Sequence, residues 1–151
     1  MNISSTVTPP RSSTLQVRSS ALRVATGVLI AAVVAVAVNG VVSIAAHALG
    51  ASDDFQQLKA PAFGSLTVLG VLFGTGGWAM IRRWTRRPAT VLRLLVPAVL
   101  VVSLVPDLLL LSDSTPGSSG LAVGALMVMH LAVTVVLVTV LRRVLPITDR
   151  A

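Results

Sequence analysis

The sequence "VATGVLIAAVVAVAVNGVVSIAAHAL", residues 24–49, contains no Asp, Glu, Lys or Arg. A helix needs about 20 apolar residues to cross roughly 30 Å of hydrocarbon, so this stretch is long enough to span a membrane. Its end, Ala46-His47-Ala48, has the small residues of a signal-peptide cleavage site. The apolar part of a signal peptide is only about 7–15 residues long, however, so we predict an uncleaved transmembrane helix.

Three further apolar stretches of similar length follow, at residues 60–81, 91–111 and 120–141. Hydrophobic residues make up 54% of the 151 residues and charged residues 11%, which is too apolar for one water-soluble domain. We therefore predict an all-α fold, a four-transmembrane-helix bundle with up-down-up-down topology, over residues 21–145. Residues 1–20 are rich in Ser, Thr and Pro, and we predict that they form a disordered cytoplasmic tail.

The basic residues flank the apolar stretches. Lys and Arg number 12 against 5 acidic residues, an excess that membrane topology explains better than nucleic-acid binding. The two outer links, residues 50–59 and 112–119, are acidic, whereas the middle link and its borders hold Arg82, Arg83, Arg86 and Arg87. Short basic loops stay in the cytoplasm. This pattern predicts a multi-pass protein of the bacterial plasma membrane with cytoplasmic N and C termini, and with these arginines at anionic lipid headgroups.

Small residues recur at a spacing that lets helices approach one another closely. They are Gly70 and Gly74 in "GVLFG", and Gly120 and Gly124 in "GLAVG". Such pairs promote helix packing in membranes, where lipid removes the hydrophobic driving force. We expect packing within one chain, and a homo-oligomer or an unknown membrane protein partner stays open as the alternative.

The stretch "SLVPDLLLL", residues 103–111, places Asp107 inside an apolar segment. Counting from the segment's end predicts a depth of about 6 Å for Asp107, whereas His130 is expected near the middle of the bilayer. A direct contact would then need a bend at Pro106 or a bridging water. We favour an interhelical hydrogen bond from His130 to Asn39 or to a backbone carbonyl, with proton handling, and then binding or ligation, as the alternatives. The candidate intramembrane polar site comprises Asn39, Ser103, Asp107, His130 and Thr134.

Several chemistries are not expected. The chain has no cysteine, which excludes disulfides and thiolate ligands. His47 and His130 differ in predicted depth by roughly 10 Å, too much for a haem between them. His130 has no histidine or carboxylate three or four residues away to share a metal, and one span carboxylate does not make an aspartyl dyad. We predict no cofactor, no metal and no catalytic residue.

Two function classes follow from these residues. The favoured one is a non-enzymatic structural or accessory membrane component. The alternative is a small transporter or proton-linked channel that uses Asp107 and His130, because intramembrane ionisable groups often mark such paths. Solute accumulation or a pH-dependent current in vesicles would distinguish the two classes.

Two segments of the second half carry a family resemblance: "TRRPATVLRLLVPAVLVVSLVPDLLLL", residues 85–111, and "ALMVMHLAVTVVLVTVLRRVLP", residues 125–146. They resemble a family of small four-span bacterial membrane proteins known as domain of unknown function 6069. The likeness is best around Arg86-Arg87-Pro88, Ser103-Leu104-Val105-Pro106 and Met129-His130-Leu131. The resemblance implies a four-helix integral membrane fold, a bacterial origin and no assigned activity.

Overall fold

The computed structural model describes residues 12–111 and 115–147, and over these ranges the chain is all helical, without strands. The four long helices are α1 (Ser12–Ala48), α2 (Ala60–Trp84), α3 (Pro88–Leu109) and α4 (Gly120–Val144), and a short 3-10 helix, η1 (Gln56–Leu58), precedes α2. Each long helix contains a segment long and apolar enough to cross a membrane, which begins in α1 at Ser20. The predicted all-α fold with four spans is confirmed.

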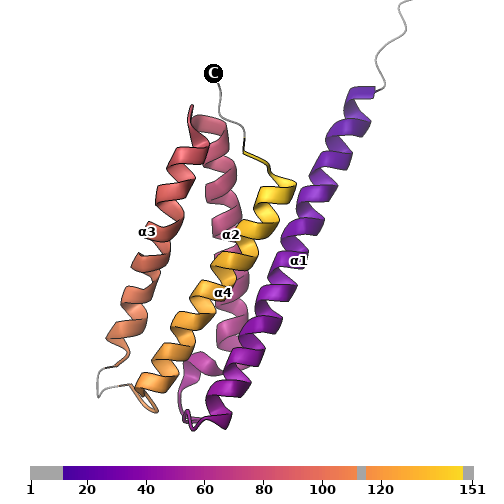
Figure 1. Cartoon of the computed structure of the whole chain (residues 1–151). Coiled ribbons are helices and arrows are strands. Elements are labelled where there is room, and N and C mark those ends of the chain that lie inside the picture. Colours follow the sequence, from indigo (N-terminus) through magenta and orange to yellow (C-terminus); the bar gives the residue numbers. More distant parts are fainter. Residues whose placement is uncertain (1–11, 112–114, 148–151) are drawn as a thin grey trace, which may run out of the picture.

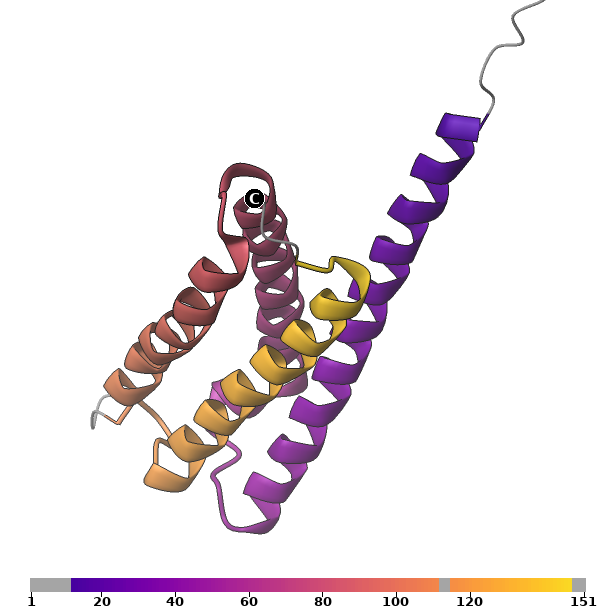
Figure 2. The ribbon, with the colours of Figure 1, turned by 45° about the horizontal axis from the view of Figure 1, so that its top comes forward.

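The helices alternate in direction, so the bundle has up-down-up-down topology (Figure 1). One end, called here the arginine end, holds the start of α1, the α2–α3 link with its arginines, and the end of α4. The opposite end, called the loop end, holds the links after α1 and after α3. Helix α4 lies between α1 and α3, and it packs most closely against α1 (Figures 1 and 2).

Helix α1 begins earlier than the sequence predicts. Residues 12–20, assigned above to a disordered tail, continue the helix that crosses the membrane, while residues 1–11 lie outside the described residues. No proline follows Pro10 and no glycine precedes Gly27 in this part of the chain. Extending an existing helix costs less than starting one, so nothing here stops it before the prolines.

Small residues on α1 permit its close contact with α4. A row at every fourth residue is buried, comprising Gly27, Ala31, Ala35, Asn39 and Ser43. A Cβ added at Gly27 would lie 2.6 Å from a methyl group of Val144 in α4, so a larger residue there would require Val144 to shift. The backbone of α1 therefore lies against side chains of α4, a close approach that small residues allow in membranes.

The predicted packing glycines divide into two groups. A Cβ at Gly74 would overlap Leu137 of α4, which makes Gly74 a point of close approach between α2 and α4. A Cβ at Gly70, Gly120 or Gly124 would meet no atom within 4 Å among the described residues. These three glycines do not bring helices together within this chain, because each faces open space.

The loop end is closed by buried side chains from the links. Phe55 and Leu58 are almost fully buried, and Ser43 Oγ of α1 donates a 2.7 Å hydrogen bond to the carbonyl of Leu58. Gly117 has a φ of 71°, and a Cβ there would lie 2.7 Å from the backbone nitrogen of Phe55. The two links thus pack against each other and cover the bundle.

Helix α3 packs less than the other helices. Its buried residues are Pro88, Leu92 and Asp107, and none of residues 93–106 is buried. Leu92 joins the apolar cluster of the arginine end, which includes Val71, Trp78 and Leu141. Helix α3 is therefore buried only near its two ends, and Val96 adds a partly buried contact with the same cluster.

Candidate functional site

A cavity of about 740 Å³ lies between α2, α3 and α4. It reaches from Gln57 at the loop end to Trp78 and Leu92 at the arginine end. Its volume falls within the range of roughly 300–1,000 Å³ that small-molecule sites occupy. Residues 93–106 of α3 are not buried, and several of them line this space.

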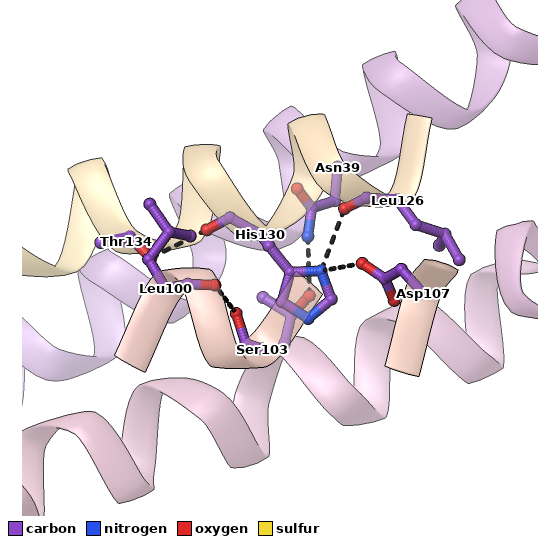
Figure 3. A network of polar contacts seen from close by, with 8 residues as sticks. Asn39, Leu100, Ser103, Asp107, Leu126, His130 and Thr134 are labelled. Atoms are coloured by element: carbon purple, nitrogen blue, oxygen red, sulfur yellow. Dashed lines mark hydrogen bonds and ion pairs between the residues drawn. The ribbon is translucent and has the colours of Figure 1, made fainter. Parts of the chain in front are cut away.

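The central polar contact in this cavity joins α3 to α4. Asp107 Oδ2 lies 2.9 Å from Nδ1 of His130, and the same nitrogen lies 3.0 Å from the carbonyl oxygen of Leu126 (Figure 3). Both neighbours are oxygen acceptors, so Nδ1 carries the hydrogen. In the neutral ring Nε2 is then an acceptor, and the His130 side chain is 39% exposed.

The Asp107 carboxylate is close to His130 but poorly hydrogen-bonded. Asp107 is only 6% exposed, and the 2.9 Å separation from Nδ1 gives charge attraction when the imidazole is protonated. Oδ2 is covered by surrounding protein atoms, and Nδ1 of His130, its neighbour at 2.9 Å, also contacts the Leu126 carbonyl. A buried carboxylate is costly unless it is both paired and hydrogen-bonded.

A second polar contact joins α1 to α2. Asn39 Nδ2 donates to Thr67 Oγ1 over 2.8 Å, and both residues are buried and line the cavity. The other amide atom, Asn39 Oδ1, has no partner although Asn39 is only 2% exposed. Oε1 of Gln57 is also buried and unpartnered. Three residues that line the cavity, Asn39, Gln57 and Asp107, therefore each hold a buried oxygen without a hydrogen-bond partner.

The five residues of the predicted polar site all line this cavity. Ser103 and Thr134 donate to backbone carbonyls of their own helices, at 2.7 Å to Leu100 and 2.9 Å to His130. The pairing differs from the favoured hypothesis, because Asn39 contacts Thr67, and His130 contacts Asp107 and a backbone carbonyl of its own helix, that of Leu126. Sequence reasoning did not include Thr67 or Gln57 in the site, although Thr67 lies on the same face of α2 as Gly70 and Gly74.

The depth of Asp107 explains why it reaches His130 directly. Helix α3, with 22 residues, is the shortest of the four and ends before α4 and α1 at the loop end (Figures 1 and 2). Asp107 therefore lies level with His130, near the middle of α4.

Other predicted residues lie away from the cavity. The four arginines stand at the end of α2 and in the α2–α3 link, and none of them lines it. His47 contacts the Ser43 carbonyl at 2.8 Å and lies 3.6 Å from Asp53 at the loop end, far from His130 along the chain. Within residues 12–111 and 115–147, no three His, Cys, Asp or Glu side chains gather as metal ligands would.

Four helices that are long and apolar enough to cross a membrane define the class of this molecule, a multi-pass membrane protein. The chain belongs to a family of unknown function (DUF6069), whose model matches residues 16–146. Neither the curated proteins nor the solved structures that were compared include a match to this chain.

Proposed function

We propose that this protein is a non-enzymatic accessory component of the bacterial plasma membrane that binds an amphiphilic molecule from the bilayer in its cavity. The observation that carries the proposal is the uneven lining of that cavity. Polar side chains lie toward the loop end and in the middle, whereas the rest of the wall is apolar down to Trp78 and Leu92. An amphiphile would place its head near Asp107 and its tail toward the arginine end.

The surroundings of the cavity agree with a ligand that arrives through lipid. The middle of α3 is not buried, so the cavity borders the lipid-facing surface of the bundle. The proposed orientation places the loop end outside and the arginine end at the anionic cytoplasmic leaflet, where each arginine contributes about 1 kcal/mol of attraction before screening. A binding role requires only a positioned polar group and an apolar wall, both of which this cavity offers.

Fluorescence of Trp78 tests the proposal directly. The chain has two tryptophans, Trp78 and Trp84, and Trp78 lines the cavity at only 4% exposure. In a Trp84→Phe variant in vesicles of unbrominated phosphatidylcholine, a long-chain probe with a bromine near its tail end should quench Trp78. We expect saturable quenching that an unbrominated analogue reverses.

Two glycines of α2 provide the matched control. A Cβ at Gly70 or at Gly76 would meet no atom within 4 Å, but only Gly70 lines the cavity. Gly70→Leu should fill the cavity and abolish saturable quenching, whereas Gly76→Leu should leave it unchanged. Quenching by no probe, or equal quenching in both variants, would show that the cavity does not bind amphiphiles.

A second candidate function is proton-linked transport, and the contact between Asp107 and His130 favours it. The two ionisable groups come from different helices and both face the cavity. In reconstituted vesicles such a protein would show a pH-dependent current or solute accumulation. Asp107→Asn should abolish that activity while the protein still assembles, and a pH-independent flux would exclude this candidate.

A further inference from the structure

We propose that the cavity is specific for a cationic amphiphile, a single long chain with an ammonium head that lies against Asp107. This inference rests on the proposed function and adds the chemical class of the ligand. It is carried by the unsatisfied polar atoms of the cavity, by its charge and by its shape.

The unsatisfied atoms are all acceptors. Asn39 Oδ1, Gln57 Oε1 and Asp107 Oδ2 are buried oxygens without a hydrogen-bond partner, and all three residues line the cavity. Nε2 of a neutral His130 is a fourth acceptor, because Nδ1 carries the hydrogen. An ammonium group has donors and no acceptor, so it suits the carboxylate of Asp107, the one acidic residue of the lining, better than a carboxylate, a phosphate or an ether does.

The charge of the cavity points the same way. Asp107 is the one acidic residue in its lining, and neither lysine nor arginine is present there among the described residues. The neighbouring imidazole is shared, because Nδ1 lies 2.9 Å from Asp107 Oδ2 and 3.0 Å from the Leu126 carbonyl. A cation against Asp107 would offset the cost of burying this charge, since buried charges are stable when they are both paired and hydrogen-bonded.

The shape of the cavity suits one chain. About 22 Å of helix separate Asp107 from Leu92, at a rise of about 1.5 Å per residue, and both residues line the cavity. Gly70 and Gly77 of α2 face this space without any atom within 4 Å of an added Cβ. The wall beyond the polar groups is apolar, so an extended hydrocarbon tail can lie along it toward Trp78.

Three brominated C18 probes with the same tail test the head preference, namely a primary amine, an alcohol and a carboxylate. In the Trp84→Phe background and neutral vesicles, with concentrations expressed per lipid, the amine should quench Trp78 at a concentration about tenfold lower than the alcohol. That ratio corresponds to one added charge-assisted hydrogen bond. The carboxylate should be the weakest probe.

Asp107→Asn should bring the amine to within about twofold of the alcohol. Asp54→Asn removes an exposed carboxylate at the loop end and should leave the tenfold preference intact, which controls for surface attraction of the cation. If Asp107→Asn does not fold, the ranking of the three probes in the Trp84→Phe protein still tests the preference for an ammonium head.

The two proposals fail in different ways. Equal quenching by amine and alcohol, or an amine preference that survives Asp107→Asn, overturns the inference of a cationic ligand. If Gly70→Leu still blocks the probes in that case, the cavity binds amphiphiles without regard to charge and the proposed function stands. If no probe quenches Trp78, both are overturned.

Discussion

At the scale of single residues, the contact between Asp107 and His130 is a buried pair whose geometry is incomplete. The carboxylate lies 2.9 Å from the imidazole, yet the Nδ1–H group has its hydrogen bond with Leu126. Burying two ionisable groups is repaid only when their hydrogen bonds are also satisfied. The pair therefore contributes little net stability, and its retention in an apolar cavity suits a binding role better than a structural one.

Removing the histidine alone should cost more than removing both partners. We expect His130→Leu to lower the free energy of unfolding by about 3 kcal/mol, because it leaves the Asp107 carboxylate buried and without its neighbour. The double variant Asp107→Leu/His130→Leu should recover most of that loss, and Asp107→Asn should keep the fold because the amide preserves shape. Denaturation in detergent micelles, followed by circular dichroism, measures all of these variants.

A double variant less stable than His130→Leu would contradict this account. It would mean that Asp107 stabilises α3 through its own contacts, independently of the histidine. The single variant Asp107→Leu separates the two cases, since it should be nearly neutral if the pair contributes little.

The sequence indicated which polar residues belong to the candidate site, but it did not indicate which of them contact each other. Asn39, Asp107 and His130 stand out because polar groups in apolar helices need partners, and all three do line one cavity. Which side chains meet depends on helix rotation and depth. Asn39 meets Thr67 instead of His130, and a threonine in a membrane helix gives no sign of this because it can bond to its own backbone.

At the scale of helices, α3 is fixed at two points and lies over the cavity between them. Its span was predicted at residues 91–111, close to the observed Pro88–Leu109. Length and hydropathy give such bounds well, because bilayer thickness sets them. The level at which α3 ends relative to α4 could not be predicted, since it depends on the path of the link that joins them.

The two glycines of "GVLFG" should respond differently to the same change. Gly74→Ala places a methyl group against Leu137 and should destabilise the protein by about 1–3 kcal/mol through overpacking. Gly70→Ala has open space and should be neutral or gain up to about 1 kcal/mol from better helix propensity. Thermal unfolding in detergent compares them, and equal effects would show that Leu137 moves aside freely.

At the scale of the whole molecule, the number of helices and their alternation followed from four apolar stretches. The cavity could not be predicted from these stretches, because it depends on which residues of α3 stay unburied in the bundle. The extension of α1 to Ser12 was also missed, since a polar segment joined to a membrane helix can remain helical although its composition resembles a tail.

The orientation of this bundle in the membrane is a prediction about the whole molecule. Arg82, Arg83, Arg86 and Arg87 gather at the arginine end, and Asp53 and Asp54 lie in the loop-end link. Because short basic loops stay in the cytoplasm, the loop end should face outward.

The chain has no cysteine, so single cysteines can be introduced without other changes. Asp53→Cys, at a side chain 99% exposed, should react with an impermeant maleimide on intact cells. Thr85→Cys in the α2–α3 link should react only after permeabilisation. The reverse pattern would place the arginines outside and would also turn the cavity's polar half toward the cytoplasm, so that its ligand would enter from the other leaflet.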